Sequence, residues 1–186
     1  MLENIIGGYE VKKGILVALV VLGLVMGICL SGLAGASIPP VTVVPRVTVQ
    51  SGGSLSIVSG TSGELNLMEF GTVAPGSTTL MTLTLGVNAN DVWTLRVSKD
   101  RDLKDDASGQ TIPSASFTYT SNGPEGPTYI TADTAFGSSG TPSNVASSSS
   151  AAGGCNVDVF YKLIVPAGQL KGYYTAPYHT YTLIVG

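Results

Sequence analysis

The feature that most constrains the fold is a two-residue alternation of apolar and polar side chains, which recurs along the chain after residue 41. In the clearest case the apolar residues at positions 81, 83, 85 and 87 are separated by Thr82 and Thr84. Successive side chains of a strand point to opposite faces, so this period predicts a strand with one buried and one solvated face. Because the same region has no sustained helical period, we predict an all-β fold.

The alternation defines the strands that we expect. They follow an extended arm over 38–44 and cover residues 46–50, 55–57, 65–70, 81–87, 93–97, 117–119, 129–132, 157–165 and 178–185. This number of short strands predicts a single antiparallel β-sandwich of the Greek-key or jelly-roll type, placed after an N-terminal hydrophobic signal helix. Two segments carry no strand pattern: 100–106 is compatible with one helical turn, and 136–154, rich in Gly, Ser and Ala, is predicted to be a flexible surface loop.

The first 36 residues have the pattern of a signal peptide. Lys12 and Lys13 precede an apolar run over 15–30, and Ala34-Gly35-Ala36 has the small-x-small pattern that signal peptidase reads. We therefore expect cleavage after Ala36, secretion, and membrane contact only through the cleaved segment. Two alternatives stay open: a retained membrane anchor, since about 20 apolar residues span a bilayer, and type IV pilin-like processing after Gly14, which would leave the run as an assembly helix.

Pro45 divides the start of the mature chain, because a proline cannot donate to a strand ladder. Residues 37–45 are predicted to be an extended arm, and residues 46–186 a β-sandwich domain. The arm is apolar and β-branched, and cleavage would make it a free N-terminus. Its candidate subunit-interface residues are Ile38, Val41, Val43 and Val44.

The charge pattern argues against nucleic acid as a partner. The chain has a net charge of -3, and its nine Lys and Arg residues are scattered rather than clustered. One acidic cluster is a weak calcium candidate, because carboxylates on a loop supply the oxygen ligands that calcium takes. It comprises Asp100, Asp102, Asp105 and Asp106. Basic residues interleave with these four, so a solvated loop with local ion pairs is the simpler interpretation.

We expect no catalytic residue and no cofactor. The chain has one His, His179, in no triad-like motif, and the mature chain has one Cys, Cys155, so a structural zinc site is excluded. We interpret His179 as a cross-strand polar residue and Cys155 as a small buried hydrophobe, although a lone Cys can also pair between chains. A hydrolase would need convergent carboxylates, and the loose candidates lack a motif. They are Glu64, Glu69, Glu125 and Asp158.

Several segments together resemble secreted β-sandwich proteins that build bacterial and archaeal surface filaments. These segments are Phe70–Gly76, Leu83–Asn90, Val92–Leu95, Ile112–Pro113 before Phe117–Tyr119, Gly172–Tyr174 and Tyr181–Val185. The similar families are the spore-coat-U-like and camelysin/TasA-like subunits and the archaeal bundling pilins. The resemblance implies that an N-terminal extended arm completes the sheet of the next subunit.

The leading hypothesis is therefore an extracellular filament subunit that polymerises with itself, head to tail, by donor-strand insertion. The first alternative is a monomeric secreted or cell-surface module that binds carbohydrate or a cell-wall polymer. Surface glycans would then contact an aromatic platform of Tyr173, Tyr174, Tyr178 and Tyr181. The arm has an alternative of its own, which is to be the first strand of its own domain.

Overall fold

The structure is a computed structural model that describes residues 42–49, 52–60 and 67–186. The predicted signal segment, Ile38, Val41 and Leu65 lie outside the described residues. No α-helix occurs among the described residues, and the all-β prediction is confirmed. None of the helices in the described part of the chain has the length and apolar character needed to cross a membrane.

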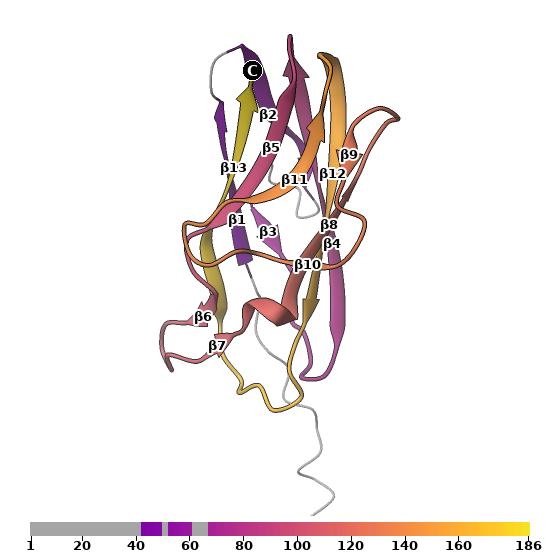
Figure 1. The fold of residues 1–186 in the computed structure, drawn as a ribbon. Helices are drawn as coiled ribbons and strands as arrows, with labels where there is room; N and C mark the ends of the chain where they lie inside the picture. The colour runs from indigo at the N-terminus through magenta and orange to yellow at the C-terminus, as the bar shows by residue number, and fades with distance from the viewer. Residues whose placement is uncertain (1–41, 50–51, 61–66) are drawn as a thin grey trace, which may run out of the picture. The chain divides into compact units, whose positions relative to one another are not determined.

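Thirteen strands and one 3-10 turn, η2 (Ser114–Ser116), make up the described fold (Figure 1). The strands are β1 (Thr42–Val49), β2 (Gly53–Gly60), β3 (Met68–Glu69), β4 (Thr78–Ala89), β5 (Trp93–Lys99), β6 (Leu103–Asp105), β7 (Thr111–Ile112), β8 (Phe117–Asn122), β9 (Thr128–Tyr129), β10 (Thr134–Ala135), β11 (Ser143–Ser148), β12 (Ala152–Ile164) and β13 (Tyr174–Val185).

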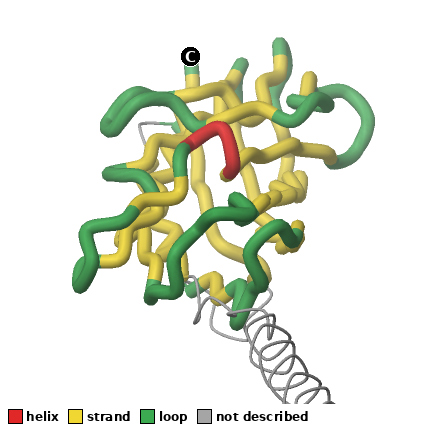
Figure 2. The backbone as a smooth tube through the Cα atoms, turned by 90° about the horizontal axis from the view of Figure 1, so that it is seen from below, coloured by secondary structure: helices red, strands yellow, loops and turns green. Residues whose placement is uncertain are grey.

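These strands form two sheets, which are seen nearly end-on in Figure 2. The first sheet has the order β3-β1-β13-β5-β11-β9, with β6 also paired to β13 and β7 to β6. The second has the order β10-β8-β12-β4-β2. Inward-facing side chains of both sheets belong to one buried cluster, in which Leu85 of β4, Leu95 of β5 and Leu183 of β13 are all fully buried. The alternation thus has the physical cause that the sequence suggested: the long strands β4, β5 and β12 each turn one face to this core.

The segment predicted to be a flexible loop over 136–154 is a correction. It contains all of β11, which lies between β5 and β9, and the start of β12. Val145 and Phe136 are 0% and 4% exposed. A few buried apolar side chains and hydrogen bonding to strands on both sides make this serine-rich stretch a strand, because strand formation depends on the neighbours more than on local composition.

The predicted helical turn over 100–106 is also wrong, because Leu103–Asp105 is strand β6, paired with β13 and β7. Leu103 is 1% exposed, so burial of one apolar side chain accounts for the extended conformation. The third correction concerns direction: β1 pairs with β13 in parallel, whereas every other strand pair in the described part of the chain is antiparallel.

The predicted break at Pro45 is not a break in the strand. β1 continues through Pro45, and its register against β13 shifts between Val43 and Pro45. On β13 the same shift spans Pro177, so an irregularity with a proline on both strands interrupts the ladder. Strands accept proline at edges and bulges, where a ladder hydrogen bond is already missing.

Candidate functional site

The N-terminal strand β1 is held on one side along its length and on the other side only at its start. On one side it pairs with β13 from Thr42↔Thr175 to Val49↔Leu183. On the other side its pairing with β3 covers only Thr42↔Glu69 and Val43↔Met68. Among the described residues, the part of β1 after Val43 is therefore the edge of its sheet.

Although β1 lies near the sheet edge, it contributes to the core. Val43 is 0% exposed, Pro45 is buried, and Val47 is partly buried against the core cluster. Full burial of a valine side chain stabilises a fold by about 1.5 kcal/mol or more. β1 therefore lies at the sheet edge and still supplies buried side chains to the core of its own chain.

A cation–π contact fastens the outer face of β1. The guanidinium carbon of Arg46 lies 3.2 Å from the centroid of the Tyr178 ring on β13. Tyr178 also contacts the loop that follows β5, because its backbone N–H donates to Asp100 Oδ1 over 3.3 Å. The sequence offered no signal for this contact, since the two residues are far apart along the chain and are brought together only by the pairing of β1 with β13.

β1 ends at Val49, and β2, which belongs to the other sheet, begins at Gly53, so three residues connect the two strands. Gly53, which opens β2, has no room for a side chain: a Cβ there would lie 2.7 Å from the backbone oxygen of Asn88. Because nothing described precedes β1 in the chain, this short connection is the one covalent link that holds β1 to the rest of the described fold.

The predicted arm residues divide into two groups. Val43 and Val44 lie on β1, fully and partly buried in their own chain, while Ile38 and Val41 lie outside the described residues. The alternative interpretation of the arm, the first strand of its own domain, describes how β1 lies in this single chain.

The four carboxylates of the weak calcium candidate each have a protein partner. Asp106 makes two hydrogen bonds of 3.0 Å with the guanidinium of Arg101, and Asp100 accepts the backbone N–H groups of Arg101 and Tyr178. Asp105 is buried and caps its own turn by accepting hydrogen bonds from Ala107 and Ser108.

Asp102 belongs to a different local network. It forms an ion pair with the buried Lys99, and Ser114 Oγ donates to it over 2.6 Å. Partial burial acts to raise the pKa of Asp102, but the hydrogen bonds from Lys99 and Ser114 outweigh it and lower the pKa. In the part of the chain that the structure describes, no three His, Cys, Asp or Glu side chains converge in a way that could hold a metal ion.

His179 lies in a buried aromatic cluster rather than at the surface. It is 0% exposed, and its Nδ1 is 3.3 Å from the hydroxyl of Tyr161, which is itself 2.6 Å from that of Tyr181. Its Nε2 has no hydrogen-bond partner, and the ring meets Phe136 edge-on at 4.4 Å between centroids. Burial, and then the positive charge of Lys99, lower the pKa of His179 to about 3.

The aromatic platform predicted for glycans is not formed. Tyr174 and Tyr181 are 0% exposed, Tyr178 is covered in part by Arg46, and Tyr173 is 48% exposed. Two further candidate residues lie on β12. Cys155 is a free, half-buried thiol. Asp158 accepts a hydrogen bond of 2.7 Å from the hydroxyl of Thr84.

No protein-family model matches this chain, and a search of curated proteins finds no significant match.

Proposed function

We propose that this protein is the structural subunit of an extracellular filament, assembled head to tail by exchange of its N-terminal strand. Its body is then a β-sandwich of the jelly-roll type, and β1 is the exchanged element. The observation that carries the proposal is the pairing of β1: an N-terminal, parallel strand near a sheet edge that still supplies a fully buried side chain, Val43, to the core.

Three properties make β1 the most easily exchanged strand of the described fold. Parallel pairing is slightly less stable per residue than antiparallel pairing. The β1 ladder is interrupted at Pro45, and β3 covers only its first two residues. Detaching β1 therefore disrupts the imperfect ladder with β13 and the two-residue pairing with β3, while the pairs among β4, β8 and β12 stay intact.

Exchange between copies reproduces the same contacts and needs no new surface. A β1 that leaves its own groove exposes apolar surface along β13, and the β1 of a second copy can cover it. Such exchange of an identical element is a low-cost route to assembly, and when the contact runs head to tail without closing, it yields an open filament. The low charge content, 11% of residues, is compatible with close packing of subunits.

The proposal is tested by locking β1 to its own chain. Arg46 and Thr180 are register partners on β1 and β13, so Arg46→Cys with Thr180→Cys should allow a disulfide between neighbouring strands. The background carries Cys29→Ser and Cys155→Ser to remove other thiols. The oxidised monomer, purified by size, should form no filaments in negative-stain images, and reduction should restore them.

The reduced double variant and each single variant are the matched controls, because they lack Arg46 or Thr180 but leave β1 free. Filaments from the oxidised, internally locked monomer at the same rate as from the reduced protein would refute strand exchange. The same preparation tests export: mass spectrometry of the native product should place the N-terminus at Ser37, whereas a chain that begins at Ile15 would favour the type IV pilin-like alternative.

A further inference from the structure

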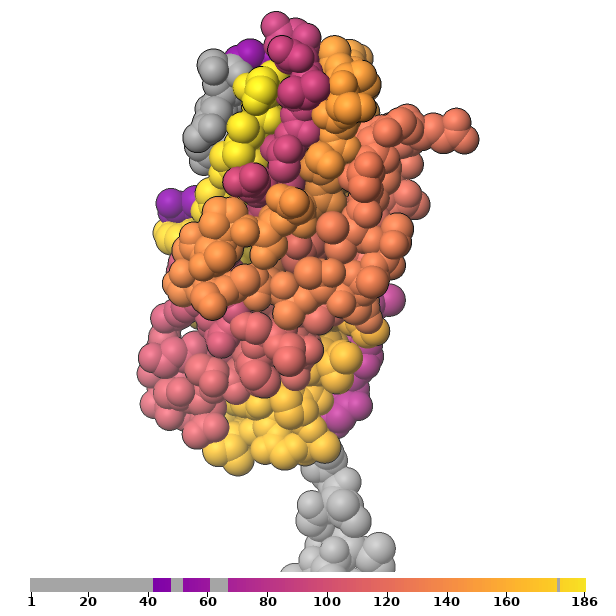
Figure 3. All heavy atoms as spheres, in the orientation of Figure 1, coloured from indigo at the N-terminus to yellow at the C-terminus, as the bar shows by residue number. Residues whose placement is uncertain are grey.

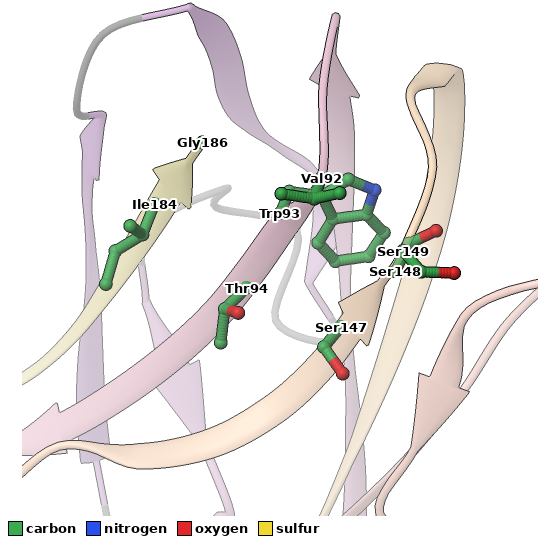
Figure 4. A pocket seen from close by; sticks show the side chains of 8 residues that line it. All are labelled: Val92, Trp93, Thr94, Ser147, Ser148, Ser149, Ile184 and Gly186. Atoms are coloured by element: carbon green, nitrogen blue, oxygen red, sulfur yellow. The ribbon is translucent and has the colours of Figure 1, made fainter.

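A groove of about 290 Å³ lies where three strands of the first sheet begin or end (Figure 4). It is bounded by the start of β5, the end of β13, and the end of β11 with the turn that follows. Four side chains in its lining carry hydroxyl groups. They are Thr94, Ser147, Ser148 and Ser149. Each hydroxyl can both donate and accept a hydrogen bond, so this side of the groove suits a ligand with several polar oxygens.

The lining also has an apolar part and no charged side chain. Val92 and Ile184 are among its residues, and both are at least partly exposed. No side chain of the lining supplies a counter-charge, so the side chains favour a neutral ligand that has hydroxyl groups on one side and C–H groups on another. The volume is at the lower end of ligand pockets and holds one small ring rather than an extended chain.

Trp93 lies behind this groove. The residue is among those that line it, yet it is only 2% exposed and belongs to the core cluster, and its buried indole N–H has no hydrogen-bond partner. Figure 4 shows the ring extending from β5 toward Ser148 and Ser149, and Ser148 is the register partner of Trp93 across the β5–β11 pair. Because this N–H is closed to solvent, Trp93 serves as a reporter next to the groove and not as a hydrogen-bond donor to a ligand.

We infer that this groove binds one neutral sugar residue of a glycan. The sugar hydroxyls would pair with the Ser and Thr hydroxyls, and its C–H face would pack against Val92 and Ile184. This site is distinct from the tyrosine platform that the structure does not form, and it uses no residue of β1. The test of sugar binding can therefore fail while strand exchange holds, and the test of strand exchange can fail while sugar binding holds.

Trp93 makes the inference directly measurable, because the chain has one tryptophan and therefore one indole N–H resonance. The ¹⁵N-labelled full chain is titrated with methyl glycosides of glucose, galactose, mannose and N-acetylglucosamine. At least one of them should shift the Trp93 indole resonance along a saturating curve. A response that stays linear, or no response to any of the four, would overturn the inference.

The decisive variant removes two hydroxyls of the lining, Thr94→Val with Ser149→Ala. Ser148 is left in place because its hydroxyl accepts the backbone N–H of Ser150 over 3.2 Å and holds the turn. The double variant should bind the sugar about tenfold more weakly, as expected for two lost neutral hydrogen bonds. Thr180→Val, on β13 but outside the lining, should bind as the parent does. Equal affinity of the double variant and the parent would assign the shift to another surface.

Discussion

The β4–β12 pair and the β1–β13 pair show two ways of holding a strand in one molecule. β4 and β12 are long, antiparallel and in continuous register from Val87↔Cys155 to Thr78↔Ile164. β1 and β13 are parallel and shift register at Pro45. Figure 3 shows the outer surface of the first sheet, where the yellow β13 strand lies beside β5. The difference leads us to expect that β1 can detach while the β4–β12 pair, which we call the frame, stays paired.

The largest effect is expected in the β4–β12 pair. Leu85 of β4 is 0% exposed and belongs to the core cluster, so Leu85→Ala should lower the free energy of unfolding by about 3 kcal/mol through lost burial and a cavity. Leu80→Ala is the matched control on the same strand, since Leu80 is 67% exposed. Urea denaturation measures both. Similar losses in the two variants would mean that β4 does not divide into a core face and a solvent face.

The second-largest effect is expected from acid, which should lower the free energy of unfolding through His179 on β13. His179 pairs in register with Pro45 of β1, and its pKa is lowered to about 3 against about 6.5 in the unfolded chain. The unfolded chain thus binds an additional proton below pH 6.5, and the folded state loses about 1.4 kcal/mol per pH unit as the pH falls from there toward the folded pKa. At pH 4.5 the expected loss is about 2.7 kcal/mol.

Between pH 6.5 and 4.5, the pH dependence of the unfolding free energy that comes from His179 can be measured apart from that of the carboxylates. Asp102 and Asp105 also have lowered pKa values, so their contributions are lost only at pH values near and below their ordinary pKa of 3.8. His179→Gln removes the titrating group, and its unfolding free energy should be nearly independent of pH in this window, whatever its absolute stability. A pH slope equal to that of the parent would assign the acid sensitivity elsewhere. The charged group close to His179 is Lys99, and the nearby titratable hydroxyls belong to Tyr119, Tyr161 and Tyr181.

The strands that the sequence predicts well are those of the frame. Positions 81–87 and 157–165 alternate strictly because each has one face in the core, and that pattern is local. The direction of β1 could not be predicted from a local pattern. It is set by its pairing with β13, which follows more than a hundred residues later in the chain. β11 was missed because Val145 and Ala146 are too few to show a period, and the groove at Trp93 because its residues come from three separate strands.

A smaller effect is expected for the contact that fastens β1. Arg46→Ala removes the cation–π contact with Tyr178, which should weaken the attachment of β1 by about 0.5–1 kcal/mol. Native-state hydrogen exchange should then be faster at β1 amides and unchanged in β4 and β12. Arg96→Ala is the matched control, because Arg96 is exposed on β5 in the same sheet. Acceleration in β4 and β12 of the same size would show that β1 does not open separately from the frame.

The smallest effect is expected at Cys155, which lies on β12 near the end of its pairing with β4. Its thiol is half-buried against the core, and burial raises its pKa, so the neutral thiol dominates at neutral pH and is a poor nucleophile. Cys155→Ser keeps the size of the side chain, and the side chain is uncharged at neutral pH both before and after the change. The thermal midpoint and the yield of filaments should therefore change little, with less than about 0.5 kcal/mol lost. Electrophoresis without reductant provides the opposing test. Covalent dimers in the parent that disappear in the variant, together with fewer filaments, would show that subunits are joined through this thiol and that strand exchange alone does not hold them.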